Sequence, residues 1–327
     1  MGATYHDTLE RVGYVWRPAL HYGIAYTLFA LSTRYIREDA YRMPALFIAG
    51  FGLGAFLVLS WSLNQAAKRR RARTGPSFRW TRANITSGLA AVAIIVSTVM
   101  AFLFEDVSIL LALLLMRLGV LILAPVIDLC SGRRPTRAGL LAAGICGTGC
   151  AFGGITGTFS PLSVSVMAVL SVYFTGYIIR LSLMTKYAKI PVRSTRGDWL
   201  VAEVKISGLA LIYFAVASFV RQLVLDHQAV IIEWRTIGIA IICGLAYGYA
   251  FVNGTLIYLD WHENVRAVTI NRSASLLAGV VASLVGWAFL EMPMPAGREW
   301  GLAGFMIIAL LIVGAESLKS EEKSPPH

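Results

Sequence analysis

Apolar residues fill most of the chain in long runs that are separated by short polar segments. A helix that crosses a bilayer needs about 20 mostly apolar residues, and the pattern predicts ten such spans. They cover residues 16–33, 44–63, 84–103, 107–129, 138–156, 160–185, 200–220, 236–258, 265–289 and 300–316. The connections leave no room for a soluble domain. We therefore predict an all-α membrane protein of ten transmembrane helices.

Composition supports this class and explains the strong positive charge. Hydrophobic residues make up 57% of the chain and charged residues only 14%, against about 25% charged in soluble domains. The net charge of +11 would suggest nucleic acid in a soluble protein. In a membrane protein it reflects the excess of Lys and Arg in cytoplasmic loops, so we expect membrane lipids and no nucleic acid as partners.

The basic residues also set the expected orientation. With the N-terminus taken as cytoplasmic, 19 of the 29 Lys and Arg residues fall on the cytoplasmic side and 6 on the other side. Both termini are therefore predicted to be cytoplasmic. The run Lys68–Arg73 contributes most, either as a topology determinant or as a contact for anionic lipid. No cleavable signal peptide is expected, and short loops with a basic bias favour a bacterial inner membrane.

Ten spans divide into two halves of five, residues 1–158 and 159–318, followed by a tail, 319–327, that we expect to be disordered. Because five is odd, the second half would enter the membrane from the opposite face. This is the inverted-repeat plan of many secondary transporters. The fold class that we predict is thus ten transmembrane helices in two inverted five-helix repeats.

Matched charges give the repeat its main support. At an offset of 155 residues, Glu105 aligns with Asp260 and Arg117 aligns with Arg272. Each acid precedes its arginine by twelve residues, and is expected in the loop just before the arginine helix. There it would either complement the helix dipole or act as a gating partner of the arginine.

Paired tyrosines recur at the start of each half. Tyr22 and Tyr26 lie one helical turn apart in the first span, and Tyr173 and Tyr177 repeat this spacing in the sixth. Tyrosines near span ends usually form an interfacial belt. The alternative is that these four line a substrate site.

The last two spans have a familiar composition. Ser275–Glu291 is a small-residue helix, a short turn containing Pro follows, and Gly301–Gly314 is a Gly-rich helix. This pair resembles the closing helices of the EamA-type repeats in the drug/metabolite transporter superfamily. A weaker copy around Pro125 and residues 132–144 lacks the glutamate and turns earlier. The resemblance implies a ten-span transporter fold, and the superfamily moves amino acids, drugs, nucleotide sugars and lipid-linked sugars.

Arg117 and Arg272 are the main functional candidates. A charge at membrane depth costs from about 3 to more than 10 kcal/mol, so such a residue needs a reason. Arg117 lies about ten residues into its span, roughly 15 Å of rise and close to the midplane, and Arg272 is nearer the cytoplasmic side. A guanidinium fork suits carboxylate or phosphate, so we predict that both hold an anionic group. The alternative is an internal salt bridge or a cap on helix carbonyls.

Other polar residues within or beside the spans are weaker candidates. Arg180 would join the substrate site or extend to lipid headgroups, and Asn253 would line a cavity. Glu203 and Lys205 are expected at the membrane interface.

Two titratable residues are candidates for coupling or gating. Asp128 would serve as a proton-coupling carboxylate or pair with Arg133 or Arg134. His21 is a candidate because histidine as a residue type changes charge near physiological pH, although a lone His near an interface is more often structural.

The sequence contains no metalloprotease, nucleotide-binding or hydrolase motif. The four cysteines are interpreted as small apolar residues, so we expect no metal and no cofactor. Transport is therefore expected rather than catalysis. The favoured function is alternating-access transport of an organic solute with an anionic group. The alternatives are a flippase for a phosphate-linked glycolipid or polyprenyl carrier, and a scaffold without transport activity, whose arginines would be consumed by internal carboxylates.

Overall fold

The structure is a computed structural model that describes residues 5–38, 42–71, 81–103, 109–155, 164–189, 193–225, 233–260, 263–289 and 297–322. Within these ranges the chain forms ten α-helices, one π-helical turn and no strand. The elements are α1 (Tyr5–Glu38), α2 (Arg42–Arg71), α3 (Arg82–Leu103), α4 (Ile109–Cys130), α5 (Arg137–Ile155), α6 (Val164–Leu183), η1 (Met184–Ala188), α7 (Arg193–Leu225), α8 (Trp234–Tyr258), α9 (Asn264–Phe289) and α10 (Gly297–Glu322).

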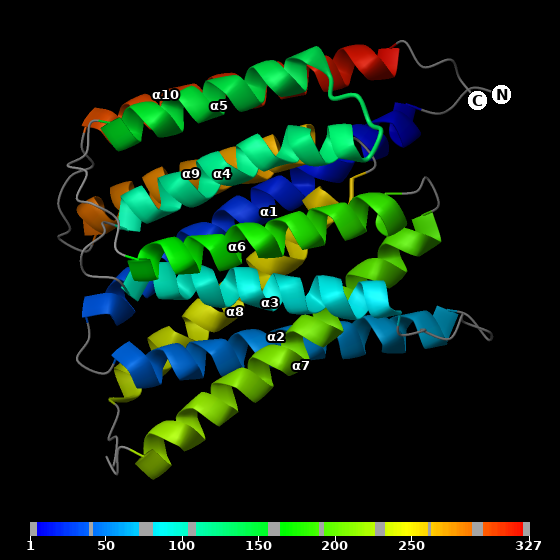
Figure 1. Cartoon of the computed structure of the whole chain (residues 1–327). Helices are drawn as coiled ribbons and strands as arrows, with labels where there is room; N and C mark the ends of the chain where they lie inside the picture. The colour runs from blue at the N-terminus through cyan, green and yellow to red at the C-terminus, as the bar shows by residue number, and fades with distance from the viewer. Residues whose placement is uncertain are drawn as a thin grey trace.

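The helices lie side by side and the chain reverses direction at the two ends of the bundle (Figure 1). Helix α1 begins and α10 ends at the same end of the bundle, on the right in Figure 1. We call this end the terminal end and the other the opposite end.

Length and composition agree with an integral membrane protein. Six helices contain a stretch long and apolar enough to cross a bilayer: Met43–Leu63, Arg82–Ala101, Val164–Ala188, Gly197–Gln222, Trp234–Tyr258 and Asn264–Phe289. The outer surface is apolar as well. On α1, for example, Leu20, Ile24 and Leu28 form an exposed stripe at helical spacing. Water would oppose such a surface, whereas lipid tails suit it.

Small residues bring helices into close contact in the lower half of Figure 1. Where α2 crosses α7, a Cβ added to Gly54 would lie 2.8 Å from the carbonyl oxygen of Gly208. A Cβ on Gly208 would lie 3.0 Å from the carbonyl oxygen of Gly54. A Cβ on Gly244 of α8 would overlap the carbonyl oxygen of Ala49 on α2. Such crossings are typical of helix packing in lipid, where van der Waals contact replaces the hydrophobic effect.

Helix α9 is buried along its first half. It packs against α1, α4, α5, α8 and α10, and its first ten residues, Asn264–Ser273, are all buried. Several of these residues are polar, so this segment brings hydrogen-bonding groups and the Arg272 charge into the interior. The position of α9 therefore determines where a functional site can form.

Candidate functional site

A cluster of buried charged and aromatic side chains surrounds the first half of α9. We call it the central cluster. It consists of Tyr22 and Tyr26 from α1, Arg117 from α4, Tyr173, Tyr177 and Arg180 from α6, Glu203 from α7, Tyr258 from α8, and Asn271 and Arg272 from α9.

Arg272 lies among phenol groups. Its terminal nitrogen Nη2 donates to the hydroxyl of Tyr177 and, at 3.1 Å, to the hydroxyl of Tyr258. The guanidinium carbon lies 4.9 Å from the centroid of the Tyr177 ring. Tyr258 in turn donates to Oδ1 of Asn271 at 2.8 Å. Nε of Arg272 has no hydrogen-bond partner among the described residues, so the guanidinium retains an unused donor.

Arg117 is the less well satisfied of the two arginines. Its Nη2 lies 3.5 Å from the carbonyl oxygen of Ser275, at the long limit of a hydrogen bond. Its guanidinium carbon lies 5.8 Å from the ring centroid of Tyr26. Ser275 is three residues after Arg272 on α9, so both arginines act near the same turn of that helix.

Neither arginine pairs with a carboxylate within the part of the chain that the structure describes. Both are buried, with 2% of Arg117 and 6% of Arg272 exposed. A buried guanidinium without a counter-charge is costly, since aromatic faces and hydroxyl groups replace only part of its hydration. The arrangement therefore favours entry of an anion.

Arg180 differs from these two because it pairs with a carboxylate. Its Nε lies 2.6 Å from Oε1 of Glu203, and its Nη2 donates to Oγ1 of Thr255 at 2.7 Å. Ser87 of α3 also donates to Oε1 of Glu203, at 3.1 Å. The interfacial position expected for Glu203 is wrong. Helix α7 begins at Arg193 rather than near residue 200, which carries Glu203 into the packed interior.

The four predicted tyrosines all lie inside the bundle. Tyr22 and Tyr26 stack with a ring separation of 5.4 Å, and Tyr173 and Tyr177 lie 4.9 Å apart. All four are at least nine-tenths buried. The structure thus brings them toward the arginines rather than to a lipid-facing belt. The sequence analysis missed Tyr258, which accepts from Arg272, and Asn271, which accepts from Tyr258.

The remaining candidates lie outside the central cluster. His21 is on the exposed face of α1, where Nδ1 lies 3.1 Å from the hydroxyl of Tyr249. Asn253 is buried and donates to the carbonyl of Tyr249 in its own helix. Asp260 is buried in the turn between α8 and α9. Glu105 lies outside the described residues.

Asp128 caps the start of α9 from the neighbouring helix α4. Its carboxylate accepts from the backbone amides of Asn264 and Val265, each at 3.0 Å, and from the side-chain amide of Asn264 at 2.8 Å. The free amides of a helix N-terminus favour a negative charge. The side chain of Asn264 also donates to Thr185 of η1 at 2.8 Å. Asp128 and Asn264 together therefore join α4, α9 and η1 at the terminal end.

Further polar contacts join helix ends and loops at the terminal end. The Thr136 hydroxyl caps α5 and lies 2.8 Å from Oε1 of Glu263 and 3.1 Å from Oε2 of Glu316, near the end of α10. Nη2 of Arg133 donates to the carbonyl of Lys189 at 3.1 Å. Burial lowers the pKa of Lys189 to about 8, although the nearby Asp128 and Asp260 carboxylates oppose this shift.

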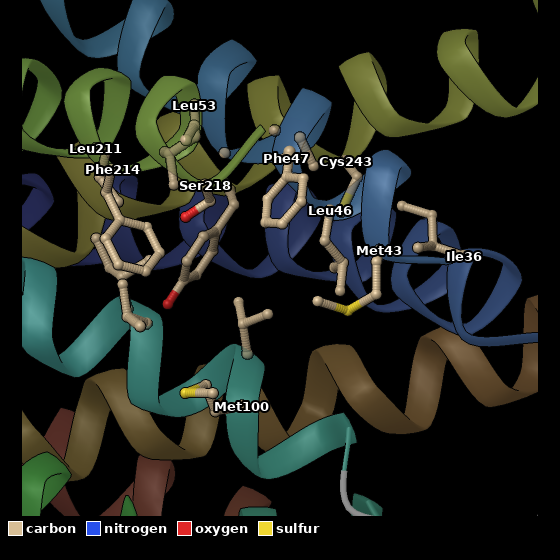
Figure 2. Close-up of a pocket in the computed structure, with 18 of the residues that line it drawn as sticks. Ile36, Met43, Leu46, Phe47, Leu53, Met100, Leu211, Phe214, Ser218 and Cys243 are labelled. Carbon is tan, nitrogen blue, oxygen red and sulfur yellow. The ribbon is translucent and has the colours of Figure 1, made fainter. Parts of the chain in front are cut away.

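An apolar cavity of about 580 Å³ lies outside the central cluster, between α1, α2, α3, α7 and α8. Residues from helix ends at the opposite end contribute to it, including Ile36, Met43, Met100 and Gln222. Two of the residues that line it, Phe29 and Tyr247, stack with their ring centroids 4.3 Å apart. Figure 2 shows Phe47 and Phe214 pointing into this space from two different helices.

Comparisons with known proteins support the fold alone. No family model matches the chain, and no curated protein does. Among the solved structures that match, one described as "Crystal structure of protein" has a TM-score of 0.64 and 13% sequence identity. The alignment covers 94% of this chain and 99% of that one. At this identity the likeness extends to the arrangement of the helices and no further.

Proposed function

We propose that the protein is a secondary transporter that moves an organic solute with an anionic group across a membrane by alternating access. Arg117 and Arg272 receive the carboxylate or phosphate, and the surrounding tyrosines line the site. The observation that carries this proposal is the burial of two guanidinium groups without a carboxylate partner in the described chain. A permanent pair would have removed the need for a ligand.

Helix packing supports two inverted repeats with boundaries at 1–158 and 159–318. If each helix is exchanged for the one five places away, the main contacts are reproduced. Helix α1 packs on α8 and α9 as α6 packs on α3 and α4, and α2 packs on α8 as α7 packs on α3. The pairs α2–α7, α4–α9 and α5–α10 map onto themselves.

The residue offset supports the same relation. Adding 155 to the bounds of α4 gives 264–285, and α9 spans Asn264–Phe289. Each arginine also stacks against a tyrosine of the first helix in its own half, Arg117 on Tyr26 and Arg272 on Tyr177. Equivalent helices thus provide equivalent contacts, as expected for a site between repeats.

The two ends of the bundle differ in a way that alternating access requires. At the terminal end, Asp128, Asn264 and Thr185 hold helix ends together. Toward the opposite end, the cavity separates α1 and α2 from α3. We interpret this state as open away from the terminal end, and propose that this end faces the cytoplasm of a bacterial cell. The resemblance to drug/metabolite transporters is consistent with the proposal.

A lipid flippase is the second candidate, and the apolar cavity is the observation that favours it. A carrier with a phosphate head and a hydrocarbon chain would use both the arginines and the apolar walls. The scaffold alternative required arginines consumed by internal carboxylates. Arg180 fits that description through Glu203, but Arg117 and Arg272 do not within the described residues.

Uptake into proteoliposomes tests the proposal. We expect Arg117→Ala and Arg272→Ala to abolish uptake of an anionic solute while membrane insertion and the folded yield stay unchanged. Arg235→Ala is the matched control, because Arg235 also lies over a tyrosine ring, Tyr35 at 5.1 Å, but is exposed at the start of α8. Normal uptake by both of the first two variants would reject the role of the arginines.

A further inference from the structure

The apolar cavity and the arginines are separate features of the interior that aromatic side chains connect. Phe29 and Tyr247 line the cavity and stack on each other. The ring of Phe29 lies 5.4 Å from that of Tyr26, and Arg117 lies over the other member of this contact, Tyr26. A continuous series of aromatic side chains therefore leads from the cavity to the charged site.

The walls of the cavity provide little for a fully polar solute. They are built mainly from aliphatic, aromatic and thioether side chains, and Phe47, Phe214 and Met100 are among those seen in Figure 2. Ser218, Thr33 and Gln222 add scattered polar atoms, and Arg221 contributes one charged side chain to the lining. Methionine adapts to irregular apolar shapes, and Met43 and Met100 both lie toward the opposite end of the bundle.

The size of the cavity matches a small-molecule site. Its volume of about 580 Å³ lies within the range of roughly 300–1,000 Å³ that is usual for ligand pockets. The predominance of apolar atoms in the walls means that an occupant gains free energy in proportion to the apolar surface that it buries.

We propose that this cavity holds the apolar body of an amphiphilic anion, a single alkyl or aryl group that carries a phosphate or carboxylate. The charged group passes the Phe29–Tyr247 pair to reach Arg117 and Arg272. This inference rests on the proposed function, because it assigns the class of substrate for the same transport site.

The first test measures binding of n-alkyl phosphates, from ethyl to decyl, to the protein in lipid nanodiscs. Each added methylene should lower Kd about fourfold, which corresponds to ~0.8 kcal/mol, until the cavity is filled. Alkylammonium ions of equal length should bind far more weakly. Equal Kd values for ethyl and octyl phosphate would overturn the inference, and so would equal affinity for the alkylammonium series.

A second test fills the cavity. Ser218 points into it (Figure 2), so Ser218→Trp should weaken octyl phosphate binding at least tenfold and change ethyl phosphate binding less than twofold. Val216→Trp is the control on the exposed face of the same helix and should change neither. If octyl phosphate binds Ser218→Trp as it binds the wild type, the cavity does not hold the chain.

The two tests also separate this inference from the proposed function. If binding depends on Arg117 and Arg272 but not on chain length or Ser218, the transporter proposal stands and the apolar assignment fails. If no anion of any length binds, both fail. Phosphatidic acid in the nanodisc distinguishes the source of the ligand. If phosphatidic acid competes with octyl phosphate, the ligand is a membrane lipid. If octyl phosphate binds tightly and phosphatidic acid does not compete, the ligand is a water-soluble amphiphile.

Discussion

The ion pair between Arg180 and Glu203 makes a quantitative prediction about stability. Glu203→Gln keeps the size of the side chain and removes its charge. The pair is short, 2.6 Å between Nε and Oε1, and the side chains are 5% and 0% exposed. Removing one partner of a buried pair leaves the other charge without compensation, which typically costs 3–5 kcal/mol. Because the Thr255 contact of Arg180 remains, we expect a loss of about 3 kcal/mol.

The assay is unfolding in mixed micelles with increasing sodium dodecyl sulfate, arranged as a double-mutant cycle. Arg180→Met should cost about as much as Glu203→Gln, because it leaves a buried carboxylate. The double variant Arg180→Met/Glu203→Gln leaves no uncompensated charge, so it should cost about 1–3 kcal/mol less than the sum of the two single variants. Glu233→Gln, an exposed carboxylate before α8, should change stability by less than about 0.5 kcal/mol. The reasoning is refuted if Glu203→Gln matches this control, or if the double variant is as unstable as both single variants combined.

Three further predictions concern the terminal end and the helix crossings. Asp128→Ala should destabilise the protein by about 1–2 kcal/mol, because the start of α9 loses its cap. Chemical unfolding measures this loss, and an unchanged midpoint of the unfolding curve would contradict it. The pKa of Lys189 is about 8 in the folded chain and 10.5 ordinarily, so the unfolded chain binds more protons between these values and stability should rise with pH from about 8 to 10.5. Melting curves at pH 7.5, 9 and 10 should show this rise, and Lys189→Met should show less of it; identical pH profiles would argue against the assignment. Gly244→Ala should cost about 1–3 kcal/mol because its Cβ would overlap the Ala49 carbonyl, while Gly279→Ala, which meets nothing within 4 Å, should be tolerated.

Hydropathy located the helices well but not their full lengths. Within the described residues, each of the ten predicted spans overlaps an observed helix, yet α1 runs from Tyr5 to Glu38 whereas the prediction covered 16–33. Apolar runs mark only the part of a helix that suits lipid, and polar turns beyond it carry no hydropathy signal. The membrane-spanning candidates by length and composition number six in the described chain.

The scarcity of charged residues in apolar runs identified the two arginines of the central cluster, but it could not predict which charged residues form pairs. Arg117 and Arg272 stood out because charges are scarce in apolar runs. Glu203 did not stand out, because it lies near the start of its apolar run. Helix α7 begins earlier, at Arg193, so Glu203 is further inside the helix than the apolar run indicates. The cap that Asp128 forms on α9 joins residues more than 130 positions apart, and no local pattern encodes such a contact. Tyr258 is an ordinary polar residue in the sequence, and only packing places its hydroxyl beside Asn271 and Arg272.

Ligand-induced thermal stabilisation is the most direct test of the central claim, that Arg117 and Arg272 form a site for an anionic group. The wild-type protein would be heated with phosphorylated, carboxylated and cationic solutes of matched size, in parallel with Arg117→Ala, Arg272→Ala and Arg235→Ala. We predict that one or more anions raise the melting temperature of the wild type and of Arg235→Ala, and that both other variants lose this response. A rise with cations alone, or an anion response that survives in both variants, would contradict the account.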